Sequence, residues 1–338
     1  MPFLIERKLV IGVASSALFD LRESHQVFQD SGEDVYRRYQ EEHVDVLLKP
    51  GVAFPFIRGF LGINGRFRRR MPVEVVLLSR NSPETGLRVM RSIAHYGLAI
   101  SRAAFVTGSS PYPYLPAFNA ALFLSANEAD VRQALAAGHP AGLVLPAGPD
   151  IGESHAAVEE PGDELRIAFD YDGVIANDEA EAVYKRNNDV KEFHTHETQH
   201  VAVPHGPGPF ATLFRQLHAM QRIEARLARR RPDYHKLLRV AIVTARNAPS
   251  HERVVTTLKS WGVSADETFF LGGMAKARVL AVFKPHIFFD DQRDHLATPV
   301  ARVAMVHVPF GIANAPRGST RVDPDLPGQD GGEKLLRL

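Results

Sequence analysis

Strand-like apolar runs recur along the chain in two sets, one within residues 9–146 and one within residues 166–309, with helix-like stretches between the runs. Strands that alternate with helical patterns are typical of βαβ units, whose strands form a parallel sheet. The sequence therefore predicts an α/β fold built from Rossmann-like parallel-sheet units. The runs lie at residues 9–13, 73–79, 104–106, 121–124, 142–145, 166–169, 240–244, 268–271, 286–290 and 303–308.

The two sets resemble each other in more than this alternation. An Arg-Asn pair follows the second run of each set, at residues 80–81 and 246–247, and each set has a Pro-Gly insert with a nearby Phe, at 49–54 and 206–210. Any two βαβ units share a general pattern, so these shared pairs and inserts carry the interpretation. We interpret the chain as an internal duplication of one α/β unit.

This interpretation predicts how the chain divides into domains. We expect two packed α/β halves, at residues 1–150 and 166–310, joined by a linker at 151–165 that is rich in Pro, Gly and acidic residues. The second half should contain a cap insert at 178–236. The remaining residues, 311–338, are rich in Gly, Pro and charge, which predicts a loosely ordered tail.

The composition argues against several classes of function. Of the 338 residues, 45% are hydrophobic and 23% charged, and the net charge is +1, so nothing favours nucleic acid or an anionic membrane as the partner. The chain has no cysteine, which excludes disulfides and thiolate chemistry. The N-terminal residues lack the signal-peptide pattern, and no apolar run is long enough to span a bilayer. We therefore expect a cytoplasmic protein.

Two carboxylates follow the apolar run that opens the second set. Asp170 and Asp172 stand two residues apart, and Gly173 comes next. If the strand continued, both side chains would point the same way, toward the crevice that forms at the carboxyl ends of strands in an open sheet. Two carboxylates there repel each other unless a cation or a shared proton relieves them. An ordinary Asp-Gly turn after a strand is the alternative.

Further polar positions follow in a fixed order. Thr244 ends the second run of this half, Lys276 follows a Gly-Gly turn, and Asp290 and Asp291 end the fourth run. Together with the Asp-x-Asp-Gly stretch, they resemble the four motifs of the haloacid dehalogenase superfamily of phosphatases. Each position alone has an ordinary explanation, as a β-former, a surface residue or a helix cap. The ordered set is the specific signal.

The resemblance implies a catalytic role for four of these side chains. Asp170 would be the nucleophile that forms an aspartyl-phosphate, and Asp172 would be the general acid and then the general base. Thr244 would hydrogen-bond a phosphoryl oxygen, and Lys276 would neutralise the phosphoryl charge. Lys284 is a rival for the role of Lys276.

A phosphate monoester is dianionic, so a carboxylate can attack it only where positive charge offsets the repulsion. Bound Mg²⁺ provides that charge and prefers hard oxygen ligands. The resemblance implies a Mg²⁺ site whose candidate ligands are Asp170, Asp172, Asp291 and Asp290, with Asp294 as a supporting partner. Which of Asp290 and Asp291 binds the metal stays open.

The first half lacks these carboxylates. At the matching positions it has Ala14, Ser16, Leu78, Ser125 and Ala126. We therefore expect one metal-dependent site, in the second half. A crevice with hydroxyls, backbone N–H groups and Arg80 can still hold phosphate. The first half thus either binds a nucleotide effector, lends Arg80 to the catalytic crevice, or serves as a packing partner only.

In the superfamily, a segment at the place of the insert covers the site and helps to select the leaving group. The insert contains four histidines, His194, His196, His200 and His205. His194 and His196 could bind zinc if they alternate on a strand, whereas exposed histidines are the commoner outcome. Phe210 and Phe214 could stack on a base or could form the core face of a helix.

Over residues 9–309 the chain resembles the cytosolic 5′-nucleotidase I family. The stretches 15–20, 78–86, 124–130, 168–172 and 288–292 carry the resemblance. It implies Mg²⁺-dependent hydrolysis of nucleoside 5′-monophosphates, AMP typically, and activation by nucleoside diphosphates, which is known for animal members. The candidate substrate-binding residues are Thr244, Ala245, Arg246, Phe210 and Arg80. Gly173 follows the wider superfamily pattern rather than that of the nucleotidases, which leaves base preference open.

Two other functions remain as alternatives. One is a phosphatase of the same mechanism that acts on sugar phosphates or other small esters. The other is a nucleotide-binding regulatory protein without catalysis, which the complete acidic set of the second half argues against. Whether the chain assembles into a homo-oligomer stays open.

Overall fold

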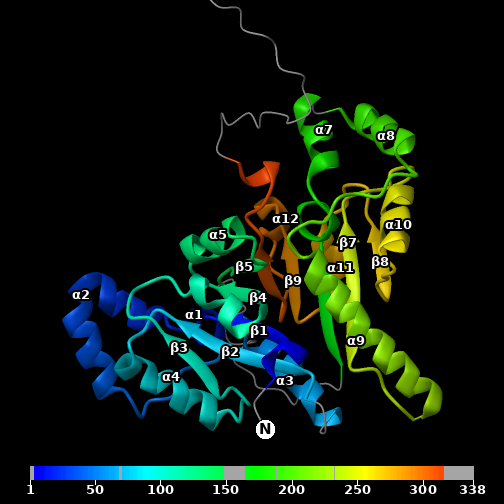
Figure 1. Cartoon of the computed structure of the whole chain (residues 1–338). Coiled ribbons are helices and arrows are strands. Elements are labelled where there is room, and N and C mark those ends of the chain that lie inside the picture. Colours follow the sequence, from blue (N-terminus) through cyan, green and yellow to red (C-terminus); the bar gives the residue numbers. More distant parts are fainter. Residues whose placement is uncertain (1–3, 68–70, 148–163, 188, 232, 316–338) are drawn as a thin grey trace, which may run out of the picture.

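The computed structural model of the chain describes residues 4–67, 71–147, 164–187, 189–231 and 233–315 (Figure 1). In these residues ten strands form one sheet, in the order β3-β2-β1-β4-β5-β10-β9-β6-β7-β8. The strands are β1 (Leu9–Val13), β2 (Val73–Ser79), β3 (Arg102–Phe105), β4 (Ala120–Ser125), β5 (Ala141–Val144), β6 (Leu165–Phe169), β7 (Leu238–Thr244), β8 (Glu267–Phe270), β9 (Ile287–Asp290) and β10 (Ala304–His307). Each overlaps a predicted run, so the α/β class with a mostly parallel sheet is confirmed.

Every neighbouring pair of strands is parallel except β5 and β10, which join the two halves. This antiparallel pair places Val306 opposite Val144 and His307 opposite Leu143. On each side of the join the strands have the same order, with the third strand of the half at the outer edge and the fifth at the join. The same order in both halves agrees with a duplication, which stays a prediction.

The sheet crosses the predicted domain boundary without a break. The linker expected at 151–165 falls mostly on residues outside the described part of the chain, and so does the predicted tail from residue 316 onward. The division into two domains therefore also stays a prediction. Residues 311–315, the first of the predicted tail, are described and include a 3₁₀ turn at Ile312–Asn314.

Helices cover both faces of the sheet. They are α1 (Ser15–Leu18), α2 (Arg22–Glu42), α3 (Phe54–Arg66), α4 (Pro83–His95), α5 (Glu128–Ala136), α7 (Glu179–Asn187), α8 (Val190–Gln199), α9 (Ala211–Arg230), α10 (His251–Ser260), α11 (Lys276–Phe283) and α12 (Arg293–Leu296). Shorter 3₁₀ turns lie at Ile5–Arg7, Tyr112–Tyr114 and Pro116–Phe118. No helix of the described residues is long and apolar enough to cross a membrane.

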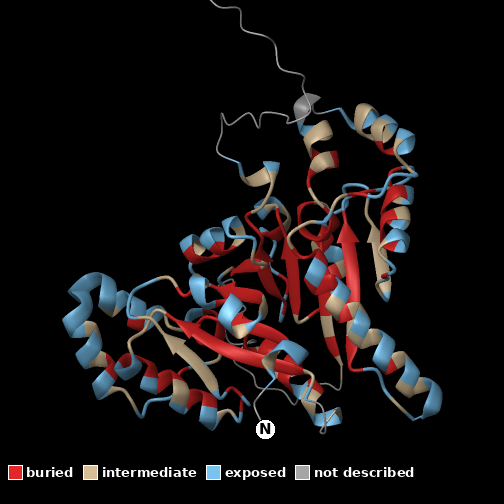
Figure 2. Cartoon of the chain, in the orientation of Figure 1, coloured by how far each residue is buried: buried red, intermediate tan, exposed pale blue. Residues whose placement is uncertain are grey.

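One hydrophobic core extends under both halves on one face of the sheet. Alternate strand residues point to opposite faces, so Phe289 joins this core while Phe288 faces the other side. The shared core also includes Phe60 of α3 and Phe214 of α9. On the opposite face the buried residues form two separate clusters, one in each half. Figure 2 shows the central strands buried in red and the edge strands β3 and β8 only partly buried in tan.

The residues of the predicted cap insert lie in two different places. Helices α7 and α8 lie beyond the carboxyl ends of the second-half strands (Figure 1). Helix α9 lies along the sheet instead, because its apolar residues Leu213, Phe214 and Leu217 repeat at helical spacing and are buried in the shared core. The segment 178–236 is therefore not a single unit over the site.

The join between the halves yields a first prediction. A Cβ built on Gly142 in β5 would collide with Cγ1 of Val306, which is itself fully buried. Because that stiff side chain has no room to move, Gly142→Ala should lower the free energy of unfolding by about 1–3 kcal/mol, as measured by urea denaturation.

The matched control is Gly65→Ala in α3, where an added Cβ meets nothing within 4 Å. Alanine is a better helix former than glycine, so this variant should gain about 0.5–1 kcal/mol. Equal stability of Gly142→Ala and wild type would show that the join tolerates a side chain there.

Candidate active site

The predicted motif residues meet at the carboxyl ends of neighbouring strands. Asp170 directly follows β6, Thr244 ends β7, and Asp290 ends β9, which flanks β6 on its other side. Lys276 begins α11 after a loop with two left-handed glycines, Gly272 and Gly273. Parallel pairing brings these ends to one edge of the sheet, which explains why residues far apart in sequence become neighbours.

Lys276 is the ionic centre of this edge. Its Nζ lies 2.7 Å from Oδ2 of Asp170 and 2.6 Å from Oδ2 of Asp290, and its side chain is 2% exposed. Burial by itself would lower the pKa of Lys276, but the charges of Asp170 and Asp290 outweigh it and raise that pKa. The ammonium group therefore stays charged and holds the two carboxylates together.

The orientation of the Asp170 side chain is fixed by the groups that bind its two carboxylate oxygens. Oδ2 accepts from Lys276, and Oδ1 accepts from the backbone N–H of Tyr171 at 2.6 Å. Burial, followed by the neighbouring carboxylates Asp290 and Asp172, raises the pKa of Asp170 to about 7, although Lys276 acts in the opposite direction. The site thus has more buried negative charge than Lys276 alone can neutralise.

Asp291 is a further buried acid at this edge, next to Glu181. Its side chain is buried, and neither carboxylate oxygen has a hydrogen-bond partner among the described residues. Its backbone carbonyl is held by His307 Nε2 at 3.0 Å and Asn314 Nδ2 at 2.8 Å. Burial and the nearby charge of Glu181 raise the pKa of Asp291 well above its usual value. A buried carboxylate of this kind is costly unless a cation or proton relieves it.

Gly173 has no side chain, and the Asp291 carboxylate occupies the space that a side chain would take. Its φ is +70°, and a Cβ there would lie 2.6 Å from Oδ2 of Asp291. A residue with a side chain would therefore be strained by its backbone and would push against the acid. The glycine of the Asp-x-Asp-Gly stretch is needed for both reasons.

These residues fit a divalent cation. The four predicted ligands, Asp170, Asp172, Asp290 and Asp291, all offer carboxylate oxygens, which hard cations prefer, and the buried Asp291 has no hydrogen-bond partner for these oxygens among the described residues. Among the described residues, the groups close enough to hold one ion together are those of Asp170, Asp290 and His295. The position between the first two already contains the ammonium group of Lys276. Asp291 is therefore the acid that an additional cation would relieve most.

Asp172 lies at the same edge but has a different partner. Arg246 forms a bidentate ion pair with Asp172. Its Nε donates to Oδ2 and its Nη2 donates to Oδ1, both at 2.7 Å. The third nitrogen of Arg246, Nη1, binds Glu197 of α8. Arg246 is predicted to bind substrate, but in this structure its guanidinium binds Asp172 and Glu197.

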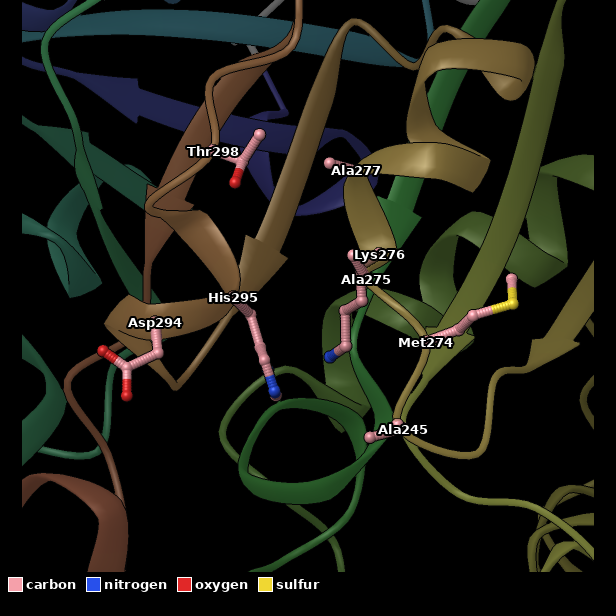
Figure 3. Close-up of a pocket in the computed structure, with 9 residues that line it drawn as sticks. Ala245, Met274, Ala275, Lys276, Ala277, Asp294, His295 and Thr298 are labelled. Atoms are coloured by element: carbon pink, nitrogen blue, oxygen red, sulfur yellow. The ribbon is translucent and has the colours of Figure 1, made fainter.

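A hollow of about 110 Å³ opens beside Lys276. Its lining includes Ala245, Lys276, Asp294, His295 and the loop before α11. Figure 3 shows Lys276 and His295 reaching toward each other from two sides of this space. The lining consists mostly of small residues and leaves room for a phosphate group beside the ammonium group of Lys276.

His295 is held in place by Asp290. Its Nδ1 lies 3.1 Å from Oδ1 and 3.2 Å from Oδ2 of Asp290. Lys276 and His295 hold the pKa of Asp290 below its usual value against the effect of burial. Because an ionised carboxylate can only accept, Nδ1 of His295 must carry the proton. The tautomer of the ring is therefore fixed by the same acid that binds Lys276.

Several predicted site residues lie elsewhere. Phe210 is fully buried and packs against Phe169 and Phe289 in the core, so the structure does not bring it to the site. Arg80 lies in the first half, where Asp130 and the carbonyl of Gly108 bind its guanidinium. Lys284, the rival of Lys276, is exposed at the end of α11, and Asp294 is exposed at the rim of the hollow.

The four histidines of the insert do not gather around one point. His196 and His200 stack on each other, with ring centroids 4.3 Å apart, and both belong to the α8 segment rather than to a strand. His205 is buried and bonds to Tyr171 and Glu197. The described residues therefore give no support to a zinc site made of these histidines.

Sequence reasoning missed His295, Glu181 and Glu197. His295 could have been found, because it lies five residues after Asp290, in the short helix α12 that follows this acid. Glu181 and Glu197 had none, because an acid in a polar helix is most often solvated. Both are buried here.

A second prediction follows from the ion pairs of Lys276. Lys276→Met keeps the length of the side chain but leaves Asp170 and Asp290 buried without their cation. Removing one partner of a buried ion pair costs about 3–5 kcal/mol, so urea denaturation without divalent cations should show a loss of that size. Lys284→Met, at the exposed rival position, should stay within about 0.5 kcal/mol of wild type. Similar losses for the two variants would mean that Lys276 does not hold this edge together.

Comparisons with known proteins agree with the resemblance in the sequence. Residues 1–315 match the family model described as 5′-nucleotidase. Human cytosolic 5′-nucleotidase 1B is 31% identical over 294 residues, which are 85% of this chain and 46% of that protein, so the chain spans about half the length of this relative. Among solved structures, histidinol dehydrogenase from Elizabethkingia anophelis is 11% identical, with coverage of 86% of this chain and 64% of that one. Its TM-score of 0.19 carries no argument. On the family match, this chain belongs to the 5′-nucleotidase family.

Proposed function

We propose that this protein is a Mg²⁺-dependent 5′-nucleotidase, which hydrolyses nucleoside 5′-monophosphates to nucleoside and phosphate through an aspartyl-phosphate. The observation that carries the proposal is the pair of buried acids at the strand ends. Asp170 is held by Lys276, and Asp291 has both carboxylate oxygens unpaired among the described residues. Membership of the family points the same way. We also propose that the second half has a haloacid dehalogenase-like fold.

Asp170 is the nucleophile in this proposal. Its Oδ1 and Oδ2 are aimed by Tyr171 N–H and Lys276, so little reorientation is needed before attack. One carboxylate oxygen forms a bond to phosphorus while the bond between phosphorus and the nucleoside 5′-oxygen breaks. Lys276 then stabilises the negative charge on the phosphoryl oxygens, together with the hydroxyl of Thr244 at the end of β7.

Asp172 moves the proton. Its carboxyl group gives a proton to the departing 5′-oxygen, and in the second step its carboxylate takes a proton from the water that attacks phosphorus. The bond between Asp170 and phosphorus then breaks, which restores the carboxylate and releases phosphate. Arg246 orients Asp172 for both transfers through its two hydrogen bonds.

Asp170 and Asp291 are the residues that would hold the cation, with Asp172 and Asp290 as further candidate ligands. When bound, Mg²⁺ supplies positive charge that offsets the repulsion between Asp170 and a dianionic ester. The excess of buried carboxylate over ammonium at this edge supports a divalent cation, and the carboxylate oxygens of these four candidate ligands suit Mg²⁺. Asp290 is already paired with Lys276 and His295, so we assign Asp291 the larger share.

AMP is the expected substrate by resemblance to the family. Helices α7 and α8 lie beyond the strand ends, where a leaving nucleoside would extend (Figure 1). A cytoplasmic location, a nucleotide effector in the first half and assembly into a homo-oligomer remain proposals as well. For the effector, Arg80 would have to release Asp130 before it could bind phosphate.

The experiment that tests this function is a phosphate-release screen with nucleoside monophosphates and sugar phosphates, with Mg²⁺ and with EDTA. We expect release from nucleoside monophosphates only with Mg²⁺. Asp170→Asn keeps the shape of the side chain but removes the attacking charge, so kcat should fall by several orders of magnitude. Faster release from sugar phosphates would favour the alternative phosphatase. No release from any ester would favour a regulatory protein, and about a tenth of wild-type kcat in Asp170→Asn would exclude it as the nucleophile.

A further prediction concerns Asp291. Asp291→Asn removes an unpaired buried charge, so without divalent cations its Tm should exceed that of wild type. Mg²⁺ should raise the Tm of wild type, since a cation at 100 times its Kd contributes about 2.7 kcal/mol, and should leave Asp291→Asn unchanged. Asp294→Asn is the matched control, because it makes the same change at an exposed acid three residues away. An equal response to Mg²⁺ in all three proteins would place the cation elsewhere.

A further inference from the structure

Helix α8 buries an acid rather than an apolar residue. Of its ten residues, all of them described, Glu197 is the one that is buried. Burying a carboxylate is costly unless it is paired, and replacing buried ion pairs with apolar residues is often neutral or stabilising. A helix held mainly for stability would therefore more readily use leucine or phenylalanine at this position.

The carboxylate of Glu197 is fully paired with groups of the catalytic half. Oε1 accepts from Nη1 of Arg253 at 2.8 Å, and Oε2 accepts from Nη1 of Arg246 and lies 3.1 Å from Nε2 of His205. Burial alone would raise the pKa of Glu197, but His205 and Arg246 hold that pKa well below its usual value. Glu197 thus remains an anion in the interior.

Arg246 connects this anion to Asp172. Its guanidinium binds Glu197 through Nη1 and Asp172 through Nε and Nη2. The group is planar with donors in fixed directions, so the position of one acid sets the direction in which the other is held. Arg246 is 4% exposed, which leaves it little freedom to find other partners.

His205 and Arg246 of this network also contact the loop that carries both proposed catalytic acids. Tyr171, which stands between Asp170 and Asp172, is fully buried, and its hydroxyl lies 3.0 Å from Nδ1 of His205. Arg246 lies over the Tyr171 ring, with its Cζ 5.5 Å from the ring centroid. His205, like Glu197, belongs to the insert after Asp178. The insert therefore contacts the acid–base loop directly through His205, whereas Glu197 reaches it only through Arg246 and His205.

We propose that Glu197 is a positioning residue, which acts through Arg246 to hold Asp172 in line with the departing oxygen. It touches neither substrate nor the reacting atoms. Docking of α8 thus completes the acid–base part of the site, whereas the nucleophile has its own direct ion pair with Lys276. This inference rests on the proposed nucleotidase function, in which Asp172 protonates the leaving group.

The need for that proton provides the test. A nucleoside 5′-monophosphate releases a poor alkoxide leaving group and needs the proton of Asp172. The analogue with sulfur in place of the bridging 5′-oxygen releases a thiolate, which departs without a proton. Both esters have the same base and ribose, so they use the same binding contacts. A fault in positioning Asp172 should slow the oxygen ester selectively.

The experiment compares kcat and KM for both esters in wild type, Glu197→Gln and Glu179→Gln with Mg²⁺. For Glu197→Gln we expect kcat for the oxygen ester to fall about 100-fold, with KM and the sulfur ester changed by less than about threefold. Glu197→Asp, which keeps the charge but shortens the reach, should fall between Glu197→Gln and wild type. Glu179→Gln is the matched control, because it removes a carboxylate from Arg253 on the side away from Arg246, and it should match wild type on both esters.

Each other result overturns the inference. Equal slowing of both esters by Glu197→Gln, in protein whose Tm shows that it is folded, would mean a purely structural role. Unchanged kcat for both would mean that Arg246 holds Asp172 without Glu197. If Glu197→Gln does not fold, the ratio of the two kcat values in Glu197→Asp decides in the same way. If wild type hydrolyses neither ester, the proposed function fails first and this inference fails with it.

Discussion

The ammonium group of Lys276, buried between the acids that end β6 and β9, is the interaction on which the site depends. Two carboxylates cannot be held at neighbouring strand ends in the interior without a counter-charge, because their repulsion grows as water is excluded. Lys276 provides that charge from α11, so its Nζ connects this helix to the ends of β6 and β9, which also pair with each other in the sheet. The arrangement still leaves Asp291 unpaired among the described residues. This end of the sheet therefore has a buried acid that one more cation would stabilise.

A second ionic network extends from this edge into the insert, and it has a different character. The contacts of Lys276 lie between the strand ends and α11, where all three side chains are buried. The contacts of Glu197 come from α8, which has no buried apolar residue of its own. Asp170, the proposed nucleophile, is therefore held by contacts within the fold, whereas Asp172 is held by Arg246, which is itself bound to the peripheral helix α8 through Glu197. Separate control of the two acids suits a reaction in which one must attack and the other must transfer a proton.

Sequence reasoning was most successful where a pattern follows from the backbone. Apolar runs with strand-like spacing gave all ten strands, and parallel pairing then required that Asp170, Thr244 and Asp290 meet at one edge. It was least successful where tertiary packing decides. Phe210 is in the core because α9 turns along the sheet, and nothing in a short aromatic stretch distinguishes that path from a cap. Glu197 looks like a solvated acid in a polar helix, and only its arginine partners from distant segments reveal its burial.

The antiparallel pairing of β5 with β10 affects how the chain folds during its synthesis. β5 ends the first half, whereas β10 is the last strand of the described chain, so a ribosome releases β5 long before its partner exists. During that interval β5 is an open edge, and the face of the first half that will share a core with α9 lacks its cover. Unpaired edges and uncovered apolar faces are where nascent chains associate wrongly. Synthesis of the second half therefore also protects the first, and a chain truncated before β10 would be a poor guide to how either half behaves alone.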